Sequence, residues 1–229
     1  MTSIADNFHE VRARIAAACA AAERDPDEVQ LLAVSKFHPT AAVREAMAAG
    51  QRRFGESRVQ ELVAKASDLQ EDDDVRWHLI GSLQTNKVRD VVHVANLELV
   101  HSVDRRKLAN ALQQELERAG RQLDVLLQVN ASGEEQKHGC SPDDAAAFLE
   151  HMQSQCTALR CRGLMAMGPL AGASRPVFDR VVALREQLRA RSGLPLLTLS
   201  LGMSGDLDEA IAAGSTMVRI GTALFGARD

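Results

Sequence analysis

A lysine, Lys36, stands two residues after the apolar run 31–34 in the stretch LLAVSKFHPT. The run predicts a buried strand, so Lys36 is expected at its exit. Burial disfavours the ammonium form and lowers the pKa of a lysine. An uncharged amine can attack a carbonyl group and form a Schiff base. We therefore expect a nucleophile; the alternative is a lysine at the rim whose ammonium group reaches solvent.

Two loops near the end of the sequence, LSLGMSGD at 199–206 and RIGT at 219–222, follow predicted strands. Small residues let backbone N–H groups approach an anion, and helix N-termini add positive potential. We predict that Ser200, Gly221 and Thr222 bind a phosphate, with Ser204 as a weaker candidate. The alternatives are that Ser204 only caps the helix running through residues 208–213 and that Gly221 only makes a tight turn.

An amine and a phosphate-binding loop together indicate a ligand with both an aldehyde and a phosphate, and pyridoxal 5′-phosphate (PLP) fits. The pyridine nitrogen of PLP usually faces an acid or an arginine. Arg219 lies between Val218 and Ile220, where a side chain pointing into the protein is expected rather than a surface ion pair. An arginine stays protonated, so it would leave the pyridine nitrogen unprotonated and weaken the ring as an electron sink.

Short apolar runs separated by helical patterns must position these residues. The runs are LLAVS (31–35), RRFG (52–55), RWHLIG (76–81), NLELVHS (96–102), LDVLLQVN (123–130), RGLMAM (162–167), LLTLS (196–200) and TMVRIG (216–221). Several are apolar at consecutive positions, as expected of strands covered on both faces. The alternation predicts an α/β fold, a single (β/α)8 TIM-type barrel over residues 1–229, with its chemistry at the C-terminal strand ends. An open doubly wound sheet is the alternative.

The helical patterns include an extra amphipathic helix at residues 3–24, which we expect to take the place of a helix missing after the eighth strand. Asp104 is the predicted N-cap of a helix that ends at Gly120. Ser141 and Pro142 are predicted to open another helix with a capping box. Two further helices are predicted at residues 40–50 and 177–188.

Composition excludes several classes of partner. The chain has 27 basic and 31 acidic residues, a formal charge of −4, and no basic block. Nucleic acid and anionic membranes are therefore disfavoured as partners, and no run of about 18 apolar residues predicts a membrane span. The four cysteines form no CxxC pair, which predicts reduced thiols in the cytoplasm. His138 and Cys140 are too few for a metal site, so no metal is predicted.

The sequence resembles the YggS/PROSC family of pyridoxal phosphate homeostasis proteins over nearly its whole length. The matching stretches are LLAVSK (31–36), FGESRVQE (54–61), WHLIGSLQTNK (77–87), SVDR (102–105), GEEQKHG (133–139), GLMAM (163–167) and GMSGDLDEAIAAGSTMVRIGTALFGAR (202–228). The resemblance implies a monomeric barrel like the N-terminal domain of alanine racemase. It also implies that Lys36 carries PLP, that Arg219 faces the pyridine nitrogen, and that Ser200, Gly221 and Thr222 hold the phosphate.

The sequence departs from this family after FGE, where Ser57 and Arg58 replace the asparagine and tyrosine of many relatives. We expect Ser57 to hydrogen-bond near the cofactor ring with a shorter reach. Leu201 stands where methionine is frequent. Neither change is expected to abolish binding.

Three functions remain open. The resemblance implies a protein that binds PLP and controls its free level, with apo-enzymes as candidate recipients. A PLP-dependent amino-acid racemase or eliminase is the second reading. It is disfavoured because the chain has no tyrosine, the second acid/base of alanine racemase, and no second domain is expected. The third is a cofactor-free Schiff-base aldolase that uses Lys36 on a phosphorylated sugar.

A charged loop, ASGEEQKHG, follows the fifth predicted strand and contains Glu134 and Lys137. Both match family positions. Lys137 is a candidate second amine for cofactor transfer, and a mobile rim loop is the alternative.

Overall fold

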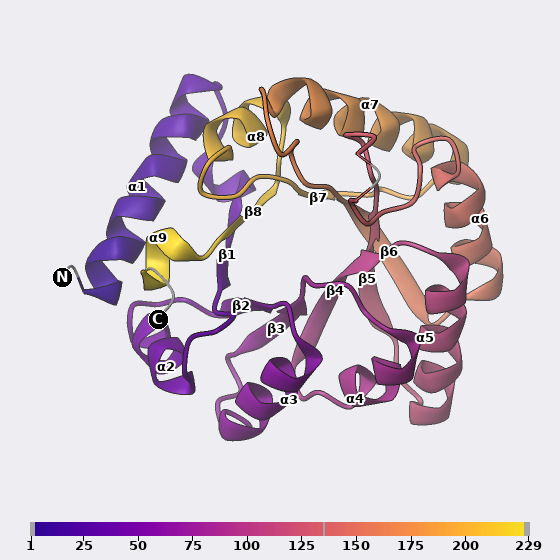
Figure 1. The fold of residues 1–229 in the computed structure, drawn as a ribbon, viewed down its shortest axis with the longest axis horizontal. Coiled ribbons are helices and arrows are strands. Elements are labelled where there is room, and N and C mark those ends of the chain that lie inside the picture. The colour runs from indigo at the N-terminus through magenta and orange to yellow at the C-terminus, as the bar shows by residue number, and fades with distance from the viewer. Residues whose placement is uncertain (1–2, 135, 227–229) are drawn as a thin grey trace.

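The computed structural model describes residues 3–134 and 136–226, and its strands close into one parallel barrel surrounded by helices (Figure 1). The strands are β1 Gln30–Val34, β2 Arg53–Glu56, β3 Arg76–Leu79, β4 Leu97–Val103, β5 Leu123–Gln128, β6 Leu159–Met165, β7 Thr198–Ser200 and β8 Met217–Ile220. Each strand pairs in parallel with the next one along the chain, and β8 pairs with β1. That last pairing excludes the open sheet, and the predicted (β/α)8 barrel is confirmed.

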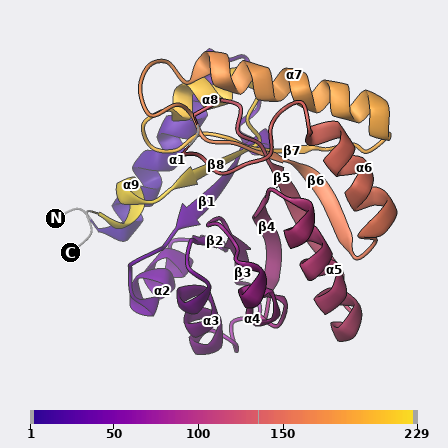
Figure 2. The ribbon, with the colours of Figure 1, turned by 45° about the vertical axis from the view of Figure 1, so that its right-hand side comes forward.

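The helices form the outer layer (Figures 1 and 2). They are α1 Ile4–Ala21, α2 Thr40–Ala48, α3 Val59–Asp68, α4 Val88–Val92, α5 Arg106–Ala119, α6 Ala145–Gln155, α7 Arg175–Ser192, α8 Leu207–Ala213 and α9 Thr222–Phe225, with short 3-10 turns at Pro26–Glu28 and Thr85–Lys87. Within the described ranges, no helix has the length and apolar character needed to cross a membrane.

The extra helix α1 packs against α8, α9 and α2 and closes the ring of helices (Figure 1). Only the four-residue helix α9 follows β8 among the described residues, so α1 occupies the position of a helix after the eighth strand, as predicted. The side chain of Asn7 donates a hydrogen bond of 2.9 Å to the carbonyl of Leu224. The Phe8 and Phe225 rings also meet edge to face, so the first and last helices stabilise one another.

Two separate apolar cores hold the barrel together. The larger core lies between the strands and the helices and includes Trp77, which is 1% exposed and packs on Phe54. The smaller core consists of Leu32, Leu99, Leu126, Met165 and Met217, each supplied by a different strand. Bulky apolar side chains usually fill such a barrel as a packed interior, but this interior also holds buried histidine and arginine side chains.

Several predicted boundaries are wrong by a few residues. Helix α5 has Arg105 as its N-cap, because the Asp104 carboxylate pairs with the Arg105 guanidinium at 2.5 Å instead of capping the helix. The hydroxyl of Ser141 accepts the Asp144 N–H at 3.0 Å, but this contact closes a turn, and α6 begins only at residue 145. Strand β6 begins three residues before the predicted run, where arginines face outward.

Candidate functional site

Lys36 lies in a tight turn directly after β1, at the C-terminal end of the barrel, and its side chain is half-buried. The His38 N–H donates to the Ser35 carbonyl at 3.1 Å and closes the turn around Lys36. Phe37 has a φ of +68°, in the left-handed region that a bulky residue rarely occupies. Such strain persists only where the surroundings enforce it, and it is common at functional sites.

Helix α3 supplies the groups that hold this turn. Lys65 donates from its Nζ to the Ser35 carbonyl at 2.7 Å, and Glu61 accepts the Phe37 N–H at 2.8 Å. The two side chains are four residues apart, so they share one face of the helix. Together they bind the peptide groups on both sides of Lys36.

The third member of this arrangement is Glu56, the last residue of β2. One of its carboxylate oxygens accepts from Lys65 Nζ and from the Ser35 hydroxyl, both at 2.7 Å, and Glu56 is fully buried. Burial raises the pKa of the Glu56 carboxyl, and the charge and hydrogen bond of Lys65 oppose that rise. We call Glu56, Glu61 and Lys65 the Lys36 clamp.

The pairing of β1 with β8 brings the predicted phosphate loop beside Lys36. Ala33 pairs with Ile220, so Gly221 follows at the level of Val34. A Cβ atom at Gly221 would lie only 3.2 Å from the Val34 carbonyl oxygen, so glycine allows this close approach. Thr222 begins α9 and is exposed. The first N–H groups of a helix have no partner within it, which suits them to bind an anion.

Arg219 points into the barrel, where only 5% of it is exposed. Its Nη1 donates to the carbonyl and to the hydroxyl oxygen of Ser200, at 2.5 and 2.7 Å, and its Nη2 donates to the Ala166 carbonyl at 3.1 Å. A guanidinium has five N–H donors, so two have no hydrogen bond among the described residues. Burial lowers the pKa of Arg219 to about 10, which keeps it protonated near neutral pH. These donors fit the nitrogen of a pyridine ring.

The predicted serines lie in three different surroundings. Ser200 is fully buried inside the barrel, and its hydroxyl contacts Arg219 and His101. Ser204 lies on the turn before α8, where its carbonyl accepts from Arg14 of α1. It does not cap α8, because Asp206 is the N-cap. Ser57 is half-buried just after β2, and its carbonyl lies so close to Gly81 that a Cβ there would clash at 2.0 Å.

The loop after β5 places Lys137 and Glu134 together as an ion pair. The Lys137 Nζ also donates to the Gly168 carbonyl at 2.6 Å, beyond the end of β6, and its side chain is only 9% exposed. Residue 135, in the middle of the GEEQKHG stretch, and residues 227–228 of the last family motif lie outside the described residues. In the part of the chain that is described, no three His, Cys, Asp or Glu side chains gather to hold a metal.

Sequence reasoning missed the Lys36 clamp and the buried His101. The motif FGESRVQE contains Glu56 and Glu61, and the four-residue spacing of Glu61 and Lys65 was a usable sign that the two act together. His101 gave no comparable signal in the sequence. His78, in the motif WHLIGSLQTNK, is buried and hydrogen-bonded to Glu98.

Comparison with known proteins gives full-length matches. The model of the family described as "Alanine racemase, N-terminal domain" matches residues 4–229. The pyridoxal phosphate homeostasis protein of Pseudomonas aeruginosa is 49% identical over 229 residues, which cover 100% of this chain and 97% of that protein. The human protein of the same name is 40% identical over 232 residues, which cover 96% of this chain and 84% of that protein. The resemblance drawn from the motifs is confirmed.

Solved structures agree with these matches. PipY of Synechococcus elongatus PCC7942, solved with PLP bound, superposes with a TM-score of 0.85 at 38% identity and covers 97% of this chain and 100% of its own. An alanine racemase of Clostridium difficile superposes with a TM-score of 0.75 at only 12% identity, over 97% of this chain and 57% of its own. The second likeness shows a shared fold alone.

Proposed function

The chain belongs to the alanine racemase N-terminal domain family, and on that premise we propose that it binds PLP as a Schiff base on Lys36 for homeostasis of the vitamer, with little or no turnover. Its relatives named pyridoxal phosphate homeostasis proteins and the PLP-bound structure of PipY support this function. The observation that carries the proposal is the register of β1 against β8, which brings the strand end before Lys36 beside Gly221.

Bound PLP supplies an aldehyde for an amine and a ring that can accept electrons from an attached amino acid. In the proposed site Lys36 is the amine, and the Lys36 clamp keeps its turn in place. Gly221 and Thr222 would bind the phosphate through backbone N–H groups, with Ser204 as a weaker candidate. Arg219 donates an N–H to the ring nitrogen, and Ser57 contributes a hydroxyl near the ring. Ser200, predicted as a phosphate ligand, holds the Arg219 guanidinium through its carbonyl and hydroxyl oxygens.

Two features argue against efficient turnover. The chain contains no tyrosine to serve as the second acid/base of a racemase. Arg219 keeps its proton near neutral pH, so the ring nitrogen receives a hydrogen bond without a proton, and the ring accepts electrons weakly. A PLP-dependent racemase or eliminase is therefore the second candidate, and a cofactor-free aldolase the third. We further propose that the protein is a monomer in the cytoplasm and that it passes PLP to apo-enzymes. The location in the cytoplasm is in keeping with its four free cysteines.

Titration of the purified protein with PLP tests the proposal. Wild-type protein should develop the visible absorption band of a Schiff base at one equivalent, and Lys36→Ala should not. Lys36→Ala should fold normally, because the clamp binds backbone groups that alanine also has. Lys137→Ala is the matched control and should keep the band. That result would also refute the hypothesis that Lys137 binds the cofactor. A wild-type protein that stays colourless would refute the proposal and favour the aldolase.

A panel of amino acids separates the first two candidates. The PLP-loaded protein should turn over none of them at a rate typical of an enzyme, which is roughly 1 per second or faster. Racemisation or elimination at such a rate would make the protein an enzyme.

A further inference from the structure

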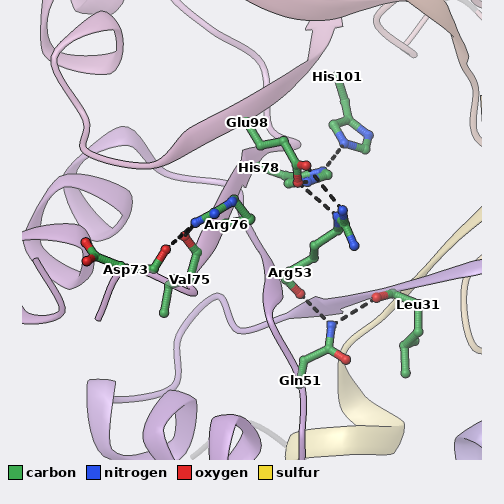
Figure 3. Close-up of polar contacts among 9 residues, drawn as sticks. All are labelled: Leu31, Gln51, Arg53, Asp73, Val75, Arg76, His78, Glu98 and His101. Carbon is green, nitrogen blue, oxygen red and sulfur yellow. Dashed lines mark hydrogen bonds and ion pairs between the residues drawn. The ribbon is translucent and has the colours of Figure 1, made fainter. Parts of the chain in front are cut away.

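A chain of hydrogen-bonded side chains crosses the interior of the barrel from its N-terminal end to Arg219. Glu98, the second residue of β4, contacts His78 Nε2 at 2.8 Å, and His78 Nδ1 contacts His101 Nε2 at 2.9 Å (Figure 3). His101 Nδ1 lies 3.0 Å from the Ser200 hydroxyl, which accepts from Arg219 at 2.7 Å. Both rings and Ser200 are essentially inaccessible to solvent. We call these five side chains the polar column.

The first step in assigning the protons is the charge on Glu98. Burial raises the pKa of this carboxyl, but hydrogen bonds from His78 and Arg53 outweigh burial and lower it to about 2. Arg53 donates to both carboxylate oxygens, at 2.9 and 3.3 Å (Figure 3). Glu98 is therefore an ionised group that only accepts hydrogen bonds, and His78 must carry a proton on Nε2.

The remaining protons follow in order. Burial lowers the pKa of His78, so its ring is neutral and its Nδ1 is an acceptor. His101 must then donate from Nε2, which leaves its own Nδ1 as an acceptor, since burial lowers the pKa of this ring as well. The Ser200 hydroxyl donates to that nitrogen, and its lone pairs face the Arg219 N–H. Each group thus has one possible role, and every hydrogen bond donates in the direction of Glu98.

We propose that Glu98, His78 and His101 are positioning residues for Arg219. They fix the Ser200 hydroxyl as an acceptor and so hold the Arg219 guanidinium in one orientation for the pyridine ring. This inference rests on the proposed PLP site. A hydroxyl free to rotate would offer Arg219 either its proton or its lone pairs. With its proton committed to His101, Ser200 can only accept from Arg219. The Arg219 N–H groups that have no partner among the described residues then keep one direction.

The far end of the polar column lies at the opposite end of the barrel from Lys36. A cavity of about 270 Å3 is found there, lined among others by Glu98, His78, Arg53, Asp124 and Arg162. Glu98 is near the start of its strand, whereas Lys36 follows the end of β1, so Glu98 is too distant to contact a cofactor bound at Lys36. Any effect of Glu98 on the cofactor must therefore pass through the column.

The first test uses the protein without cofactor and therefore does not depend on the proposed function. Nitrogen-15 NMR of the histidine side chains should show His78 and His101 neutral, each with a protonated Nε2 and an unprotonated Nδ1. Assignment by His78→Gln and His101→Gln identifies the two rings. A proton on Nδ1 of either ring, or a doubly protonated ring near neutral pH, would overturn the proposal.

The second test compares two acids at the same end of the barrel. Glu98→Leu removes the acceptor, and Asp124→Leu is the matched control, because Asp124 lines the same cavity and pairs with Arg160 and Arg162 but does not touch the column. Glu98→Leu should raise the dissociation constant of PLP about tenfold, the effect of losing one or two hydrogen bonds. It should also shift the absorption maximum of the Schiff base.

Glu98→Gln keeps an acceptor for His78 and should restore both the affinity and the absorption maximum. Asp124→Leu should stay within about twofold of wild type, the scatter expected for a change away from such features. Equal effects of Glu98→Leu and Asp124→Leu would mean general destabilisation and would overturn the proposal, as would an unchanged affinity in folded Glu98→Leu. Absence of PLP binding by wild-type protein would refute the proposed function and leave the NMR result on the column intact.

Discussion

The Lys36 clamp and the polar column support neighbouring parts of one site in different ways. The clamp lies outside the barrel wall under α3 and holds backbone groups with a buried ion pair. The column lies inside the barrel and holds one side chain, Arg219, through neutral histidines and a serine. The clamp therefore places residue 36 whatever its side chain, whereas the column acts on the chemistry of one guanidinium.

The two regions also respond to pH in opposite directions. The folded chain raises the pKa of Glu56 in the clamp, so this residue contributes stability that is lost as the pH rises above 4.5 and through the raised value. The folded chain lowers the pKa values of His78 and His101, so they contribute stability that is lost as the pH falls below 6.5. Charge pairing and neutral hydrogen bonding are thus separable by experiment.

The largest expected effect is that of removing the clamp cation. Lys65→Met leaves the Glu56 carboxyl buried without its partner and should lower the free energy of unfolding by about 3 to 5 kcal/mol. Urea denaturation measures the change. Lys87→Met is the control, because the Lys87–Asp90 pair is exposed and should matter little. Adding Glu56→Leu to Lys65→Met should recover much of the loss, and a loss below about 1 kcal/mol in the single variant would contradict the buried pairing.

The next effect comes from acidifying the polar column. Below pH 6.5 the unfolded chain binds protons that the buried rings of His78 and His101 do not. The free energy of unfolding should therefore fall with pH by up to about 1.4 kcal/mol per pH unit for each ring. Urea midpoints between pH 7.5 and pH 5 give the slope. His101→Leu should reduce the slope, and His93→Gln, on an exposed residue, should not; equal slopes in all three proteins would contradict neutral rings.

A smaller effect is expected at the rim of the clamp. Glu61→Ala removes the acceptor of the Phe37 N–H, a hydrogen bond worth about 1 kcal/mol, and should weaken PLP binding about fivefold. The melting temperature should change little, since Glu61 is partly exposed. Spectroscopic titration with PLP measures the affinity. Glu61→Gln keeps an acceptor oxygen and should bind like wild type; a weaker Glu61→Gln than Glu61→Ala would show that the side chain acts in another way.

The smallest effect belongs to a residue that departs from the family motif. Arg58 lies 4.7 Å from the centre of the Phe37 ring and is 64% exposed. Arg58→Ala should lower the free energy of unfolding by about 0.5 kcal/mol, as for an exposed cation–π contact. Repeated denaturant unfolding measures the change. A loss above about 2 kcal/mol would contradict an exposed contact and show that Arg58 stabilises the turn as strongly as the clamp residues do.

The same comparison shows what a sequence can reveal. The strands, the barrel and the position of Lys36 follow from local apolar patterns. All eight predicted strands are present, with their ends displaced by no more than three residues. Half of the clamp left a signal that was missed, because Glu61 and Lys65 are four residues apart in one helix. The predicted start of α5 was wrong because the Asp104 carboxylate, the predicted capping group, pairs with the Arg105 guanidinium instead.

The polar column could not be predicted in the same way. His78, His101 and Ser200 come from three strands, and His101 is 99 residues from Ser200. Their contact depends on the register of every strand between them, including shifts within β4 against both of its neighbours. A one-residue change of register would turn these side chains to the other face of the strand. The motif WHLIGSLQTNK marked His78, but nothing in it indicated that His101 was its partner.

Borohydride reduction followed by peptide mass mapping tests the central claim most directly. Wild-type protein mixed with one equivalent of PLP is reduced, digested and searched for the added phosphopyridoxyl mass. The account predicts that mass on the peptide containing Lys36, and its absence there from Lys36→Ala protein. Stoichiometric modification of another lysine, Lys137 included, or no modification of the wild-type chain, would contradict the assignment of Lys36 as the residue that holds the cofactor.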